Sequence, residues 1–144
     1  MSETLHVVCP NCNTTNRVHR ERLGAGATCG SCKAALIPAH PFELTQAGFE
    51  RHVGASDLPL VVDFWAPWCG PCRSMAPAYE HAAAELAPGV RLAKLNTEEV
   101  PDVAARFGIR SIPTLIAFRN GREVARQSGA MNLPGLLGWI KANV

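Results

Sequence analysis

Six cysteines form three pairs, and two residues separate the cysteines within each pair. The pairs are Cys9/Cys12, Cys29/Cys32 and Cys69/Cys72. Cysteine thiolates bind metal ions and attack disulfides, so each pair is a candidate for metal or redox chemistry. In a reducing compartment, paired cysteines are more often metal ligands or catalysts than structural disulfides. The sequence around each pair indicates which chemistry it supports.

The third pair lies between an apolar run at 58–65, typical of a buried strand, and a segment of helical spacing at 74–86. Cysteines three residues apart on a helix share a face, and their Cα atoms are about 5–6 Å apart, which suits a disulfide. We expect Cys69 at the start of the helix, where backbone N–H groups and the helix dipole stabilise a thiolate. We expect Cys72 to lie one turn deeper and to be better protected. The predicted order is attack on a substrate disulfide by Cys69, then resolution of the mixed disulfide by Cys72. A metal-binding pair or an inert buried pair is the alternative.

Asp63 stands inside the apolar run, with Val61 and Trp65 two residues away on the same predicted face. A buried carboxylate without a cation has a raised pKa, so Asp63 could accept a proton from Cys72, directly or through water. The alternative is a hydrogen-bonded aspartate that holds a turn. Lys94 belongs to the next predicted strand, 90–95, and could either lie near Asp63 or be a solvated lysine at a strand end.

Sixteen residues separate the first two pairs, Cys9/Cys12 and Cys29/Cys32. Two such pairs at this spacing predict a tetrahedral Cys₄ zinc site. Four thiolates at about 2.3 Å would close the coordination shell, so the predicted zinc is structural rather than catalytic. Two local disulfides or an iron centre are the alternatives.

Composition divides the chain into two unequal parts. Residues 1–37 carry few large apolar side chains, and units below about 40 residues usually need a metal, disulfides or a partner to fold. We therefore predict a zinc-binding module at 1–37, a stiff Pro-bounded linker at 38–41 and a larger domain at 42–144. In the larger domain we expect the order β-α-β-α-β-α-β-β-α, which predicts an α/β fold with one mixed sheet between helices.

Other expected elements of this domain are a helix that Thr45 caps and that runs to about Val53, a helix at 100–107, and a final helix capped by Asn132. Strands at 114–118 and 123–127 flank Asn120-Gly121, a strong hairpin signal. Pro77 interrupts the helical segment 74–86.

From Phe42 to Val144 the chain resembles the thioredoxin family. The shared segments are VVDFWAPWCGPC, which contains the third cysteine pair, together with KLN at 94–96, SIPT at 111–114 and the hairpin RNG. The resemblance implies a thioredoxin fold and a protein-disulfide reductase that cycles between dithiol and disulfide. It also implies that an NADPH-dependent thioredoxin reductase returns the electrons and that oxidised proteins are the substrates.

The resemblance also assigns roles to particular residues. It places a buried carboxylate at Asp63 and a cis peptide before Pro113, which would present the backbone of Ile112 to an extended substrate segment. Base rates alone do not support a cis bond there. It implies a flat contact surface for substrates that is made of Trp68, Gly70, Pro71, Gly129 and Ala130.

The Cys₄ segment ahead of this domain resembles that of thioredoxin 2, the zinc-binding branch of bacterial thioredoxins. The resemblance implies one structural zinc ion, no organic cofactor, and a module that tunes redox or partner behaviour. Oxidation of the ligands could expel the zinc, which is a hypothesis from ligand chemistry. The rival interpretation is a zinc-dependent adaptor or holdase without turnover, but the intact third pair and Asp63 argue against it.

The chain of 144 residues has a net charge of only +2, and 47% of its residues are hydrophobic. No run approaches the roughly 20 apolar residues that a bilayer requires, and the start of the chain does not resemble a secretory signal. We therefore expect a cytoplasmic protein without a membrane partner, and a monomer by default. Residues 1–37 have a slight basic excess but no aromatic residue to stack on bases, which does not favour nucleic-acid binding.

Overall fold

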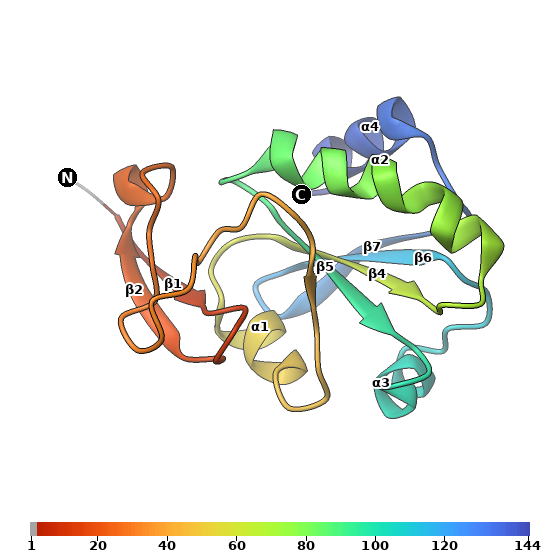
Figure 1. Ribbon diagram of the computed structural model, residues 1–144, viewed down its shortest axis with the longest axis horizontal. Coiled ribbons are helices and arrows are strands. Elements are labelled where there is room, and N and C mark those ends of the chain that lie inside the picture. The colour runs from red at the N-terminus through yellow and green to blue at the C-terminus, as the bar shows by residue number, and fades with distance from the viewer. Residues whose placement is uncertain (1–2) are drawn as a thin grey trace.

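Two separate β-sheets organise the molecule, which the computed structural model describes for residues 3–144 (Figure 1). The smaller sheet is an antiparallel hairpin of β1 (Thr4–Val8) and β2 (Thr15–His19), followed by a 3₁₀ turn at Arg20–Arg22. Alternate residues of the hairpin turn inward, so its apolar side chains form a small core with buried Cys9 and Cys29. Leu58 of the larger part of the chain also packs into this core.

The larger sheet has five strands in the order β3-β5-β4-β6-β7. β4 (Leu60–Trp65) lies at its centre, parallel to β5 (Arg91–Asn96) and antiparallel to β6 (Thr114–Arg119). β3 (Phe42–Glu43) and β7 (Arg122–Ser128) form the edges. The apolar run of β4 is buried because both faces of the sheet are covered. The predicted mixed sheet and the predicted element order are confirmed.

Helices cover both faces of this sheet (Figure 1). α1 (Phe49–Ala55) and α3 (Pro101–Arg106) pack with one face, in a core that contains Phe49, Phe64 and Phe118. α2 (Gly70–Leu86) and α4 (Leu133–Asn143) pack with the other face, in a core that contains Tyr79, Leu136 and Ile140. The Tyr79 hydroxyl lies 3.1 Å from the carbonyl oxygen of Val61 and 2.9 Å from that of Ala93, so α2 is tied to the two central strands.

One predicted helix start differs from the structure. Thr45 does not cap α1, because its hydroxyl accepts from Gly48 N–H within a preceding turn and the helix begins at Phe49. α2 begins at Gly70 with Cys69 as its N-cap, so Cys69 stands at the start of the helix as expected. Pro71 lies in the first turn, where a missing N–H costs no hydrogen bond. Asn132 caps α4 as expected, since its side chain accepts from Gly135 N–H at 2.9 Å. In the part of the chain that is described, no helix has both the length and the apolar character needed to cross a bilayer.

Candidate redox site and metal site

Cys69 is the N-cap residue of α2, and Cys72 lies in the first turn of that helix. Their Cα atoms are 5.3 Å apart and their sulfurs form a disulfide. The backbone N–H of Cys72 donates to Cys69 Sγ at 3.2 Å. An amide aimed at Sγ, together with the positive end of the helix dipole, would stabilise a thiolate at Cys69 after reduction. Cys69 is 4% exposed and Cys72 is 2% exposed, so the expected difference in protection is present but slight.

The loop that precedes β6 closes over the disulfide. The carbonyl oxygen of Ile112 lies 3.7 Å from Cys69 Sγ, and the Ile112–Pro113 peptide is cis, as the resemblance implies. Gly129 N–H donates to the carbonyl oxygen of Pro113 at 2.9 Å, which fixes the end of β7 against this loop. Gly129 has a φ of 99°, a conformation that glycine adopts readily. The cis-proline loop, Gly129 and the cysteine pair therefore share one end of the sheet.

Exposed apolar surface lies beside the pair. The Trp68 side chain is 67% exposed, and its indole Nε1 donates to Glu98 Oε1. Gly70, Pro71, Gly129 and Ala130 are also exposed. Next to Trp68 is a shallow pocket of about 170 Å³, which is lined by Trp68, Thr97, Ala104, Ile109, Arg110, Ser111 and Ile112. An extended peptide could place a side chain there while its backbone meets Ile112.

Asp63 is almost completely enclosed in β4, with 1% of its surface exposed. Burial raises the pKa of Asp63 to about 7, although Lys94 partly offsets this effect and the charge of Glu43 adds to it. Its Oδ1 has no hydrogen-bond partner within residues 3–144. A carboxyl group with a pKa near 7 can both accept and release a proton at neutral pH, which is the property that a general base requires.

Lys94 is the residue of β5 directly opposite Asp63, and Glu43 of β3 is opposite Lys94 on its other side. The three side chains therefore stand in a row on one face of the sheet. The Lys94 Nζ lies 4.1 Å from the centre of the Trp65 ring, a cation–π contact. Lys94 is placed as a neighbour of Asp63, while Glu43 is a neighbour that the sequence did not single out.

The four cysteines of the first unit converge on one point. Their sulfurs all lie within 4.8 Å of one another. The Cys9–Cys32 and Cys12–Cys29 sulfur separations are both 3.6 Å. A tetrahedral zinc ion with Zn–S bonds of about 2.3 Å places its sulfurs about 3.8 Å apart, so the arrangement fits zinc. These four residues would hold the ion in a closed shell.

Amide donors surround the cluster, as thiolate ligands require. The backbone N–H of Asn11 donates to Cys9 Sγ at 3.3 Å, and that of Ser31 donates to Cys29 Sγ at 3.4 Å. The Asn16 side chain also donates to Cys29 Sγ, at 3.5 Å. Donation from the Cys32 backbone and from Asn16 lowers the pKa of Cys29 to about 6. Burial raises the pKa of Cys9 to about 11, so this ligand would release its proton as a metal ion binds.

Comparison with known proteins identifies both parts of the chain. The thioredoxin family model matches residues 40–142, and the model described as "Thioredoxin 2, N-terminal" matches residues 8–34. This chain belongs to the thioredoxin family. It is 43% identical to thioredoxin C-3 of Corynebacterium nephridii over 93% of this chain and 92% of that protein. It is also 43% identical to the thioredoxin of Rhodospirillum rubrum, over 71% of this chain and 98% of that protein.

Thioredoxins are thiol-disulfide oxidoreductases, so the predicted class of enzyme is confirmed, as is the resemblance of the first unit to thioredoxin 2. The roles predicted for individual residues and the domain boundaries remain predictions. Sequence reasoning missed Glu98 and the pocket residues Thr97, Ala104, Ile109 and Arg110. One signal was available for Thr97 and Glu98. Both follow β5, and the carboxyl ends of neighbouring parallel strands lie at one edge of a sheet, here beside the third cysteine pair.

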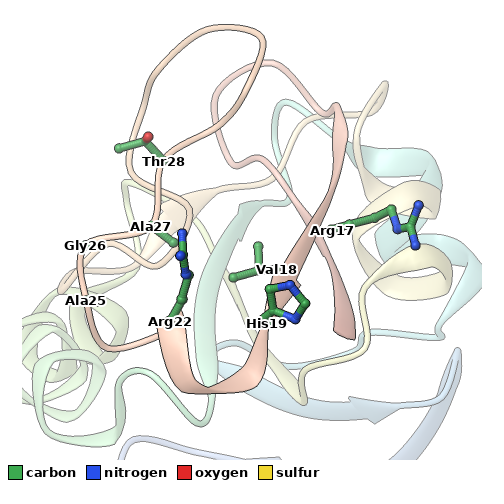
Figure 2. Close-up of a pocket in the computed structure, with 8 residues that line it drawn as sticks. All are labelled: Arg17, Val18, His19, Arg22, Ala25, Gly26, Ala27 and Thr28. Atoms are coloured by element: carbon green, nitrogen blue, oxygen red, sulfur yellow. The ribbon is translucent and has the colours of Figure 1, made fainter. Parts of the chain in front are cut away.

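Another hollow, of about 470 Å³, lies on the first unit (Figure 2). It includes basic side chains of Arg17, His19 and Arg22. Figure 2 shows Arg17 directed away from Arg22, and none of the lining residues is Phe, Trp or Tyr.

Proposed function

We propose that this thioredoxin is a protein-disulfide reductase in which Cys69 is the nucleophile and Cys72 the resolving cysteine. The observation that supports the assignment most directly is the donation of Cys72 N–H to Cys69 Sγ at the start of α2. Cys72 lies inside the helix with its sulfur bonded to Cys69, so it is already within reach of the sulfur that it must attack.

The proposed cycle transfers two electrons to the substrate. The Cys69 thiolate attacks one sulfur of the substrate disulfide, and the other substrate sulfur leaves as a thiolate that takes up a proton. Cys72 then loses its proton and attacks Cys69 Sγ. The second substrate thiol is released, and the Cys69–Cys72 disulfide remains. Asp63 is proposed to accept the Cys72 proton, since its raised pKa of about 7 suits exchange at neutral pH.

Substrate binding is assigned to the surface around the pair. An extended segment of an oxidised protein would pair with the backbone of Ile112 before Pro113 and lie across the exposed Trp68. Gly70 and Pro71, together with Gly129 and Ala130, would let a substrate backbone approach closely because they present little side-chain bulk.

The remaining proposals concern partners, metal and compartment. An NADPH-dependent thioredoxin reductase would return the protein to its dithiol form, and the protein would act as a monomer. Cys9, Cys12, Cys29 and Cys32 would hold one structural zinc ion, which would supply folding energy to the first unit. The proposed site of action is the cytoplasm, since a reducing compartment keeps ligand thiols from forming disulfides.

A coupled assay with thioredoxin reductase, NADPH and insulin tests the proposal. The wild-type protein should support NADPH consumption, and Cys69→Ser should abolish it. Cys29→Ser is the matched control, because it removes a cysteine outside the redox pair and should keep most of the rate while losing zinc. If Cys69→Ser reduced insulin as fast as wild type, the assignment of Cys69 as nucleophile would be wrong. If wild type bound insulin without turnover, the adaptor or holdase interpretation would replace this one.

A further inference from the structure

Arg91 is a buried cation where the first unit meets the thioredoxin domain. It begins β5 and is 2% exposed, with its guanidinium 4.7 Å from the centre of the Phe42 ring. Within residues 3–144 it forms no ion pair with a carboxylate. Burial lowers the pKa of Arg91 to about 10, so it stays charged at neutral pH. A buried charge is costly unless an opposite charge compensates it, so its counter-charge must come from another kind of group.

The hydrogen bonds of Arg91 lead to the first cysteine pair. Its Nη2 donates to the carbonyl oxygen of Val8 at 2.8 Å, and Val8 directly precedes Cys9. Its Nη1 donates to Ser56 Oγ at 3.1 Å, beyond the end of α1. A negative charge at Cys9, as a metal-bound thiolate would carry, would stabilise the guanidinium. Arg91 therefore links the thioredoxin domain to the backbone that carries a metal ligand.

His52 of α1 extends this link to the other side of the pair. It is 2% exposed. Its Nδ1 accepts from Arg91 Nη2 over 3.4 Å, and its Nε2 donates to Asn13 Oδ1 at 3.1 Å. Arg51 Nη1 also donates to the carbonyl oxygen of Asn13, at 3.1 Å. Since Asn13 directly follows Cys12, the thioredoxin domain holds the first pair at both ends.

The contact at Asn13 leaves no spare room. A Cβ atom at Gly48 would lie 2.6 Å from Asn13 Oδ1. Gly48 has a φ of −94°, which any residue can adopt, so a larger residue there is opposed by space rather than by conformation. A larger residue at Gly48 would displace Asn13 without touching Arg91 or a cysteine.

A divalent ion held by four thiolates carries a net double negative charge. We propose that the metal-loaded cluster of Cys9, Cys12, Cys29 and Cys32 is the counter-ion of Arg91, so that metal binding and docking of the first unit stabilise each other. The inference rests on the proposed metal site and goes beyond a structural role confined to the first unit. Linkage is reciprocal. Loss of the metal leaves the Arg91 charge buried without a counter-charge, and loss of Arg91 lowers the affinity of the four cysteines for the metal.

Competition between the full-length protein and a chromophoric zinc chelator measures how the loss of Arg91 changes the affinity for zinc. Arg91→Met should weaken zinc binding at least tenfold, while Arg91→Lys, which keeps the charge, should lie closer to wild type. Arg17→Met is the matched control, because Arg17 is an exposed cation of β2, and it should change the affinity less than twofold. Gly48→Ala should also weaken binding. Equal affinities for Arg91→Met and Arg17→Met would overturn the proposal. If wild type bound no zinc at all, the proposed metal site would fail as well.

Hydrogen exchange on the wild-type protein measures how the loss of zinc changes the docking of the first unit. This measurement does not depend on the folding of any variant. The amide of Arg91 donates to the carbonyl oxygen of Pro59, and that of His52 donates to the carbonyl oxygen of Gly48. Removal of zinc should speed exchange at both amides. The amide of Leu136, on the opposite face of the sheet, donates to Asn132 and should keep its protection. Unchanged exchange at Arg91 and His52 after zinc removal would overturn the proposal.

Discussion

Replacement of Asp63 by asparagine should stabilise the oxidised protein at alkaline pH. In the folded protein, burial raises the pKa of Asp63 from 3.8 to about 7. When a group has a higher pKa in the folded state than in the unfolded state, the folded protein loses stability as the pH rises from the unfolded-state pKa to the folded-state pKa. At 1.36 kcal/mol per pKa unit, the folded protein at pH 8 carries a cost of about 4 kcal/mol that Asp63→Asn removes. This is an upper value, because the amide must fit the same enclosed site.

Urea unfolding of the zinc-loaded, oxidised protein at several pH values checks this prediction. The gain for Asp63→Asn should approach its maximum near pH 8 and fall below about 1 kcal/mol at pH 4, where the carboxyl group is protonated in the folded state. Glu80→Gln is the matched control. It makes the same chemical change at an exposed position of α2 and should alter stability by less than about 0.5 kcal/mol at either pH. A gain independent of pH, or no gain at pH 8, would refute the assignment of the cost to a buried carboxylate.

Three other substitutions, two of them paired with a control variant, have definite expected outcomes. Cys72→Ser should trap substrates as mixed disulfides with Cys69, seen as adducts on non-reducing gels that Cys69→Ser does not form. Trp68→Ala should raise the KM for insulin roughly 5- to 30-fold with little change in kcat, because it removes an exposed aromatic contact. Val124→Ala, which shortens an exposed side chain of β7, should leave KM unchanged. Tyr79→Phe should destabilise the protein by about 1–3 kcal/mol in urea unfolding, because the buried carbonyl oxygens of Val61 and Ala93 lose their shared donor.

Local patterns were enough to predict the elements of the thioredoxin domain and their order. Interactions between residues close in the sequence determine three of these features: the apolar run of β4, the Asn120-Gly121 turn and the Asn132 cap. The start of α1 was predicted wrongly for a related reason. Thr45 could cap either a helix or a turn, and in the structure its hydroxyl accepts from Gly48 N–H within a turn that packs against Asn13, a residue far away in the sequence.

The spacing of the cysteines together with the sequence around them pointed to two kinds of site. All three pairs have two residues between the cysteines, but only the third follows an apolar strand and begins a helical segment. Only the tertiary structure brought Cys9, Cys12, Cys29 and Cys32 to one point and set Ile112 against Cys69. Only the tertiary structure showed that Arg91 reaches Val8. Spacing fixes geometry within a few residues, whereas burial, pKa and counter-charge depend on contacts between segments that the chain order does not place side by side.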